Sequence, residues 1–301
     1  MFRVLKWLFL GTVLLGAFVL FGLPLVVNTE RGRNRIAELL GAGLDRKVTI
    51  GALDIGFLWS SLDMKEFAIA NPAGFPAGEM LRAGDVHLDV ALRPLLDRKV
   101  QGAFRGSGFL VNVLKKGGAT NLDGLGGGGG GGGAPDVDLD VTLALADSRL
   151  VVEDLDRGEK IELDGVSLEM RLANRADSPD ARLKIRIRSV DQRVLRVRDL
   201  ELDALASGDY LDVAKVSASL AREGTLTGGG RVRVRGGDEW SARLEMHQVG
   251  LDAQLMPLAA AMFPLAAAAR GQLDGVLEGT FELRGRGLTW EAMKPTLAGE
   301  G

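Results

Sequence analysis

Few residues in this chain have the types and spacing that catalysis requires. The 301-residue sequence contains two histidines and no cysteine. Both histidines, His87 and His247, fall within alternating polar and apolar residues, where a single histidine is usually a solvated side chain. Neither Gly-x-Ser-x-Gly nor His-Glu-x-x-His, the motifs of serine hydrolases and zinc peptidases, occurs. The sequence therefore predicts no catalytic residue and a protein that is not an enzyme.

Carboxylates alternate along two segments and could suggest a metal site. Asp136, Asp138 and Asp140 form one set, and Glu162 and Asp164 form another. Carboxylate oxygens are ligands that Ca²⁺ prefers, but the glycine and terminal glutamate of an EF-hand loop are missing. Alternation instead places such side chains on the solvent face of a strand. No metal ion and no cofactor are predicted.

Eight consecutive glycines, Gly126–Gly133, are followed by Ala134-Pro135. A phosphate-binding loop would need Lys-Ser or Lys-Thr at the start of a following helix. The segment that follows, Asp136–Asp140, is acidic and strand-like instead. Because polyglycine has the greatest backbone freedom to lose, residues 126–135 are expected to form a flexible loop.

Alternation of polar and apolar residues is the dominant pattern of the chain. Residues Arg182–Arg188 read Arg-Leu-Lys-Ile-Arg-Ile-Arg, and near-copies fill residues 136–250. Strands are expected over Val48–Phe57, Ser61–Ala70, Ala83–Leu92, Val100–Leu114, Val137–Leu145, Arg149–Asp154, Lys160–Leu172, Ala181–Val190, Val194–Leu205, Leu211–Leu220, Gly224–Arg235, Ser241–Val249 and Gly271–Arg284. Turn residues separate these strands, which predicts a mainly β fold built on a long, curled antiparallel sheet with one apolar face.

The side chains expected on the apolar face are aliphatic and of moderate size. They are Leu139, Val141, Leu143, Leu145, Leu183, Ile185, Ile187, Val232, Val234, Leu244 and Met246. Two short helices, over residues 30–42 and 255–269, are the elements available to cover this face. Two arrangements remain open: the sheet folds over on itself around a self-packed core, or it forms a groove that acyl chains fill.

The N-terminal segment has the character of a membrane anchor. No charged residue occurs from Trp7 to Val27, whereas Arg3 and Lys6 precede this stretch. A helix needs about 20 apolar residues to cross a bilayer. The stretch is long for a cleavable signal and lacks a small-residue cleavage pattern. We expect a transmembrane signal anchor over residues 7–27, with residues 1–6 in the cytoplasm and the remainder outside.

Composition argues against nucleic acid as a partner and favours lipid as the covering of the apolar face of the sheet. The chain has 37 basic and 40 acidic residues, for a net charge of −3, which argues against nucleic-acid binding. Aromatic residues make up only 5% of the chain, which is low for a well-packed β-sandwich. The low aromatic content and the anchor together favour a groove occupied by lipid.

Several short motifs occur along the chain in an order typical of one family. They are the first helix ending at Gly41 followed by Arg46-Lys-Val-Thr-Ile50, then Asn71-Pro-Ala-Gly-Phe75, Val86–Leu96, Gly117-Gly-Ala-Thr-Asn121 and Gly271–Gly287. With the signal anchor, this order resembles the AsmA-like proteins of Gram-negative bacteria over essentially the whole chain. The resemblance implies a periplasmic β-protein anchored in the inner membrane, related to bridge-like lipid carriers and linked to outer-membrane biogenesis.

These observations lead to one expected organisation. Residues 28–125 form the AsmA-like N-terminal helix and strands, and residues 136–301 form a β-groove section that ends early relative to the family. The expected function is binding or conducting phospholipid along the groove, and the alternative is a scaffold for outer-membrane protein assembly with a self-packed β-core. Phospholipid, the inner membrane and other envelope proteins are the expected partners.

Overall fold

The computed structural model shows a mainly β protein with two helices among the residues it describes. The described residues are 27–56, 60–95, 97, 99–124, 138–175, 178–192, 195–220, 224–233, 237–250, 275–287, 296 and 298–300. The expected anchor up to residue 26, the glycine loop over 126–135, the helix over 255–269 and Val234 lie outside them. Within the described part, no helix has the length and apolar character needed to cross a membrane.

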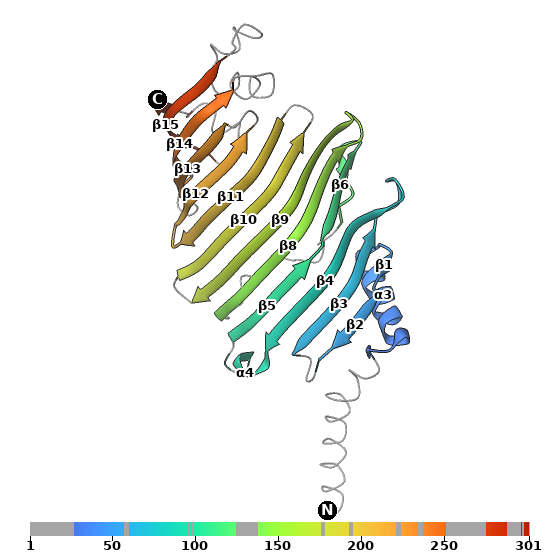
Figure 1. Ribbon diagram of the computed structural model, residues 1–301. Coiled ribbons are helices and arrows are strands. Elements are labelled where there is room, and N and C mark those ends of the chain that lie inside the picture. The colour runs from blue at the N-terminus through green and yellow to red at the C-terminus, as the bar shows by residue number, and fades with distance from the viewer. Residues whose placement is uncertain are drawn as a thin grey trace, which may run out of the picture.

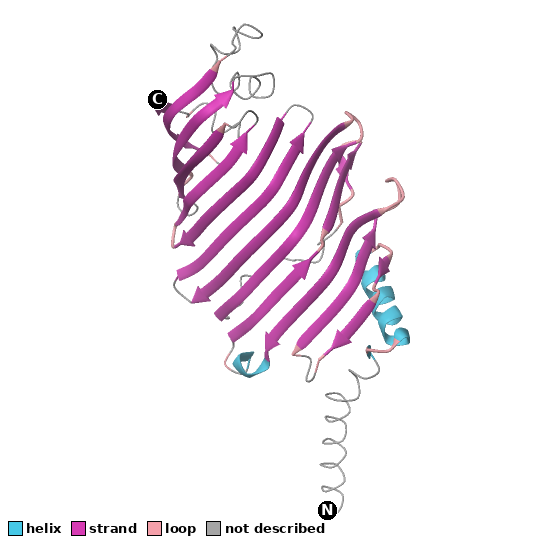
Figure 2. Cartoon of the chain, in the orientation of Figure 1, coloured by secondary structure: helices cyan, strands magenta, loops and turns pink. Residues whose placement is uncertain are grey.

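The elements follow one another in the order α3 (Glu30–Leu44), β1 (Val48–Thr49), β2 (Ala52–Ile55), β3 (Ser61–Ala70), β4 (Glu79–Ala91), α4 (Leu92–Leu95), β5 (Lys99–Ser107), β6 (Leu110–Lys116), β7 (Ala119–Thr120), β8 (Asp138–Asp154), β9 (Glu159–Arg175), β10 (Ser178–Gln192), β11 (Leu195–Ser207), β12 (Tyr210–Leu220), β13 (Thr225–Arg233), β14 (Glu239–Gly250), β15 (Val276–Arg286) and β16 (Ala298–Glu300). All sixteen strands of the described part belong to one sheet. Figures 1 and 2 show this sheet as a broad, twisted layer with α3 along the end formed by β1–β3. The prediction of a long, antiparallel-rich sheet is confirmed.

The sheet departs from the predicted antiparallel arrangement at one junction. β5 and β6 pair with β8 in parallel, whereas β4 pairs antiparallel with β5. Parallel neighbours require a long crossover connection, because the chain must return to the side of the sheet where the first strand began. Residues 125–137, which include the glycine run, make this connection between Gly124 and Asp138. Every later neighbouring pair, from β8–β9 to β15–β16, is antiparallel.

A series of backbone irregularities crosses the sheet. Residues with positive φ interrupt or separate strands at Glu66, Gly108, Asp147, Gly165, Asp199 and Gln248, which we call the bulge line. Gly108 and Asp147 directly follow the paired residues Ser107 and Ala146. Farther along the sheet, the Arg188 guanidinium reaches Asp147 at 3.2 Å. A β-bulge bends its strand and increases its twist, so these positions are expected to add local bends to the sheet.

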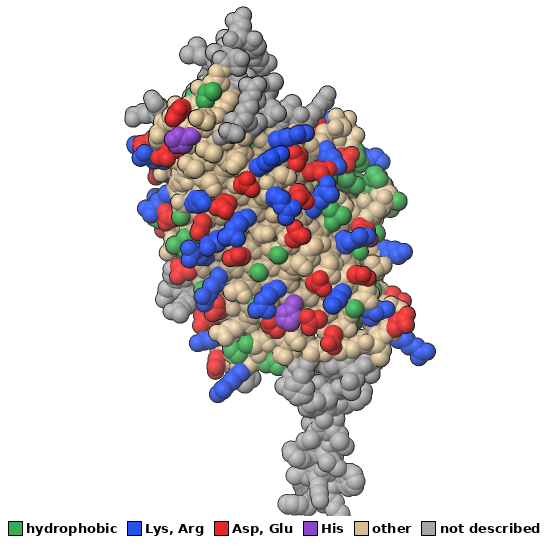
Figure 3. Space-filling model, viewed as in Figure 1, with side chains coloured by type: hydrophobic (Ala, Val, Ile, Leu, Met, Phe, Trp, Pro, Cys, Tyr) green, Lys and Arg blue, Asp and Glu red, His purple; other side chains and the backbone are tan. Residues whose placement is uncertain are grey.

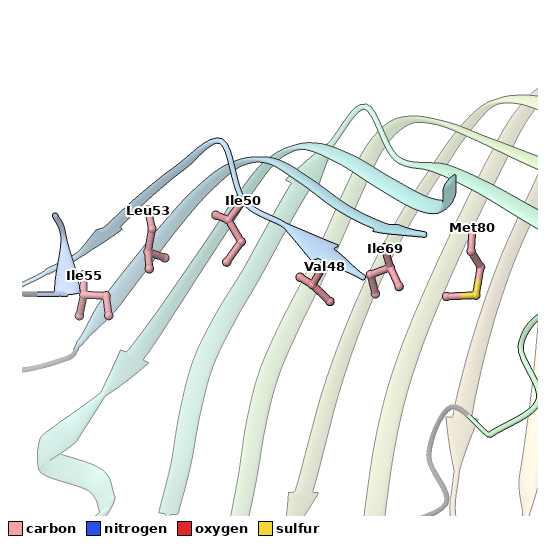
Figure 4. Close-up of a cluster of buried hydrophobic side chains, with 6 residues drawn as sticks. All are labelled: Val48, Ile50, Leu53, Ile55, Ile69 and Met80. Atoms are coloured by element: carbon pink, nitrogen blue, oxygen red, sulfur yellow. The ribbon is translucent and has the colours of Figure 1, made fainter. Parts of the chain in front are cut away.

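A small hydrophobic core occupies the N-terminal end of the molecule. Figure 4 shows its buried members, which are Val48, Ile50, Leu53, Ile55, Ile69 and Met80. Ile36, Ala37 and Leu44 of α3 pack against this cluster, as does Val27, the last residue of the expected anchor. The side chain of Thr29 caps α3 by accepting a hydrogen bond from the Gly32 amide at 3.2 Å. The expected helix over residues 30–42 is therefore present and extends to Leu44.

Candidate functional site

The strand register brings apolar residues of many strands into continuous rows on one side of the sheet. Directly paired residues share a face, because successive side chains of a strand point to opposite faces. One row consists of Leu88, Phe104, Leu143, Met170, Leu183, Ala204 and Val213. A second row consists of Leu145, Leu168, Ile185, Leu202, Val216, Gly228, Leu244 and Phe281. We call the surface formed by these rows the apolar face.

A third row joins the remaining predicted residues to this surface. It consists of Val141, Leu172, Ala181, Ala206, Leu211, Val232 and Trp240. Leu139 precedes Val141 by two positions, Ile187 follows Ile185 by two, and Met246 follows Leu244 by two, so each lies on the same side. All ten described members of the predicted set therefore lie on the apolar face.

The apolar face remains open over the strands that follow β6. Of the ten predicted residues, Ile187 is buried, at 8% exposure, and the other nine are partly exposed. In the described part of the chain, α3 packs at the opposite end, and α4 is a single turn after β4. No second layer of described strands lies over the sheet. In the described part of the chain, the predicted residues therefore form a surface that is covered by neighbouring residues of the same sheet.

A hollow of about 250 Å³ interrupts this surface at β12–β14. Its apolar lining includes Val213, Val216, Val232, Trp240, Ala242 and Leu244. Gly230 also lines it, and a side chain at this position would collide with the Ser241 carbonyl oxygen, 2.5 Å from an ideal Cβ. The close approach of β13 and β14 at this point therefore requires a residue without a Cβ. Val232 and Leu244, both predicted as groove residues, thus line a hollow.

The opposite side of the sheet is a polar face on which charges of both signs alternate. Figure 3 shows basic and acidic side chains spread over the side of the sheet that Figure 1 presents. Ion pairs connect neighbouring strands, including Arg182 to Asp203 at 3.6 Å and Lys215 to Glu201 at 2.6 Å. Exposed pairs of this kind contribute about 0–1 kcal/mol each. The side chains of the polar face are therefore well solvated by water, in contrast to those of the apolar face.

The alternating carboxylates noted in the sequence take part in these ion pairs. Asp140 accepts hydrogen bonds from Arg171 at 3.3 and 3.4 Å, and Asp164 accepts one from Arg188 at 3.1 Å. Hydrogen bonds from Lys160 and Arg149 lower the pKa of Glu162. Among the described residues, no group of histidine and carboxylate side chains could hold a metal ion.

One of the two histidines lies in an arrangement that the sequence does not indicate. His87 lies between two carboxylates, with Nδ1 2.6 Å from Asp63 and Nε2 2.9 Å from Asp89, and Arg105 donates to Asp89 at 3.0 Å. The hydrogen bond with Asp63 and then that with Asp89 raise the pKa of His87. Asp63 belongs to β3, so only the register of β3 with β4 brings it to the histidine.

Two motifs that the sequence presents separately meet in one buried polar cluster. Asn121 is fully buried and donates from Nδ2 to the Asn71 side chain at 2.8 Å and to the Asn112 carbonyl at 2.7 Å. Its Oδ1 accepts from the Leu114 amide at 2.9 Å. All three contacts are made to other parts of the fold, so Asn121 joins the Asn71–Phe75 turn to β6. This role is structural.

The side chains that could support a function therefore divide between an open apolar face and a charged polar face. The apolar face offers a binding surface whose rows contain a single hydrogen-bonding side chain, that of Trp240. The polar face offers paired charges. Comparison of the chain with protein-family models finds no match, and neither does comparison with curated protein sequences.

Proposed function

We propose that this chain binds phospholipid, with acyl chains lying along the apolar face. The observation that supports the proposal is that the three rows of mostly aliphatic side chains together cover the sheet from β4 to β15 without a charged residue, and that most of their members remain partly exposed. A fully buried Leu or Ile gains about 1.5–3 kcal/mol over an exposed one. Soluble monomers rarely expose continuous apolar patches larger than a few hundred Å². Such a surface calls for an apolar occupant.

Acyl chains suit this surface in chemistry and in length. Because Trp240 is the one hydrogen-bonding side chain in the rows, a ligand gains little there from polar groups and much from methylene groups. The sheet from β5 through β8–β15 comprises nine strands. At a spacing of about 4.8 Å, eight intervals give roughly 38 Å. That length exceeds the ~30 Å hydrocarbon core of a bilayer, so the surface accommodates both chains of a phospholipid.

The cellular setting belongs to the same proposal. The resemblance to AsmA-like proteins supports an inner-membrane anchor over residues 7–27, a periplasmic sheet and a role without catalysis in outer-membrane biogenesis. The alternative is an assembly scaffold with a self-packed β-core. It has less support, because the strands of the described part form one layer rather than two packed ones.

Site-specific photo-crosslinking in living cells tests the proposal. A benzophenone amino acid replaces Leu143 or Ile185 on the apolar face, and adducts are identified by mass spectrometry. The matched controls replace Thr142 and Lys184, which are the preceding residues of the same strands and point to the polar face. We expect phospholipid adducts at Leu143 and Ile185, and at least ~10-fold fewer at the controls.

Two other labelling patterns would argue against the proposal. Equal labelling at the four positions would indicate general proximity to membrane rather than a binding face. Protein adducts at Leu143 and Ile185, without lipid, would favour the assembly scaffold.

A further inference from the structure

A second hollow lies on the polar face at the ends of β12–β15. Its volume is about 560 Å³, within the range of small-molecule sites. Its lining includes four arginines, Arg231, Arg233, Arg284 and Arg286, together with Tyr210 and Glu239. The strand register explains the cluster, because Arg231 pairs with Ser241, which pairs with Arg284, while Glu239 pairs with Arg286. We call this the arginine pocket.

The four guanidinium groups differ in how closely a carboxylate neutralises them. Arg231 binds Asp212, and Arg286 binds Glu239 at 2.8 Å. Arg284 has Glu282 at 3.8 Å, and Glu282 also lies 3.9 Å from Arg243. Among the described residues, no carboxylate lies within ion-pair distance of Arg233. Two of the four positive charges in the pocket, those of Arg233 and Arg284, are therefore poorly compensated.

The lining of the pocket also contains a hydrogen-bond donor that has no acceptor. Four buried side-chain nitrogen atoms of the described chain lack a hydrogen-bond partner, and one of them, Arg233 Nε, belongs to a polar-face residue that lines this pocket. A buried donor without an acceptor costs about 1–3 kcal/mol. An anion beside Arg233 would supply an acceptor to this group.

Two of the four arginine side chains, those of Arg231 and Arg233, pack against neighbouring residues before any ligand binds. The Cζ atoms of Arg231 and Arg233 lie 5.2 and 6.0 Å from the centre of the Tyr210 ring, at cation–π distances. Gly237 lies against Arg233, with its ideal Cβ position 3.1 Å from Arg233 Cδ. Prior ordering of long side chains reduces the entropy lost on binding.

We propose that the arginine pocket binds a phosphate group, with Arg233 and Arg284 as its principal ligands. A planar guanidinium matches two phosphate oxygens with two parallel hydrogen bonds. The two negative charges of a phosphomonoester match the two guanidinium groups that have no close carboxylate among the described residues, those of Arg233 and Arg284. The phosphate belongs either to a soluble compound or to a lipid headgroup. Trp240 lines both this pocket and the apolar hollow of β12–β14.

Isothermal titration calorimetry of the full chain, held in an amphipathic polymer at pH 8, tests this site. The probes are inorganic phosphate, glycerol 3-phosphate and dihexanoyl phosphatidic acid. We expect saturable binding that Arg233→Gln or Arg284→Gln weakens about tenfold or more, since each removes a charge-assisted pair. Arg233→Lys retains the charge but not the bidentate geometry, and should retain intermediate affinity.

The matched control is Arg186→Gln, which removes an arginine on the polar face of β10 whose nearest carboxylate, Glu201, is also 3.8 Å away. This variant should bind like the wild type. Equal affinity for the three probes identifies the phosphate group alone as the ligand, and tighter binding of phosphatidic acid identifies a lipid headgroup.

Two results would overturn the proposal. One is the absence of saturable binding of all three probes to the folded wild-type chain. The other is unchanged affinity in both glutamine variants when their circular dichroism and melting temperature match the wild type. Neither result bears on crosslinking at Leu143 and Ile185, so the proposed lipid-binding face is tested separately.

Discussion

On the polar face, the pKa of His87 depends on the carboxylates that lie beside it on β3 and β4. Both ring nitrogens lie within hydrogen-bond distance of a carboxylate, 2.6 Å from Asp63 and 2.9 Å from Asp89. Two such partners favour the imidazolium, which donates from both nitrogens. The pKa of His87 is therefore raised above its ordinary value of about 6.5, first by the hydrogen bond with Asp63.

The raised pKa has a definite consequence for stability. Because the folded state holds the proton more tightly than the unfolded state, the stabilisation is fully present below about pH 6.5 and is lost as the pH rises through the folded-state pKa. The difference in unfolding free energy between wild type and His87→Gln should therefore shrink across that interval. Urea denaturation at a series of pH values measures it.

Asp63→Asn should lower the pKa of His87, since it removes the largest cause of the upward shift. The pKa is read from the pH dependence of the imidazole resonances by NMR. Asp164→Asn provides the control, because Asp164 lies on β9 and pairs with Arg188 rather than with His87. An unchanged His87 titration in Asp63→Asn would contradict the assigned cause.

At the scale of the strands, the bulge line marks positions where a residue with positive φ interrupts a strand or separates two strands. Asp199 interrupts β11 with a φ of 49°, a left-handed conformation that costs an L-residue with a Cβ roughly 1–2 kcal/mol. The neighbouring register shifts by one residue between Arg198 and Glu201, as expected for a bulge. The bend is therefore maintained against a local conformational cost.

Asp199→Gly should stabilise the protein by about 0.5–1 kcal/mol, because glycine adopts positive φ without steric penalty. Ala206→Gly, at a position of the same strand that is regularly paired with both neighbouring strands, should destabilise it by a similar amount. Chemical denaturation of the two variants measures both effects. The same sign for both changes would show that the Asp199 backbone is not strained.

Much of this sheet could be predicted from the sequence. The pattern that identifies a β-strand, polar and apolar residues in alternation, lies within the residues of that strand alone. The shared side of Leu143 and Ile185 follows from that pattern. The bulge at Asp147 could not be predicted, since a break in alternation looks like a turn, and two separate strands were expected where β8 is continuous. The parallel junction and the His87 pair depend on register between strands, which alternation along one strand does not determine.

At the scale of the molecule, the two ends of the sheet differ in how they are stabilised. At the N-terminal end, α3 closes a small core in which Ile69 is 7% exposed. Beyond β8, Ile185 is partly exposed, and its described neighbours are residues of its own layer. The first end behaves as a conventional packed core. The second has the properties of a surface that is completed by a ligand.

A matched pair of substitutions distinguishes these two environments. Ile69→Glu buries an unpaired carboxylate and should lower the unfolding free energy by about 3 kcal/mol or more. Ile185→Glu leaves the carboxylate in reach of water and should cost only about 1 kcal/mol, while lowering the phospholipid recovered per chain. Residues 28–301, purified without detergent, provide the sample for urea denaturation and lipid mass spectrometry. If Ile185→Glu unfolded the protein as severely as Ile69→Glu, the face around Ile185 would be a dry core, and the acyl chains would have no place on it.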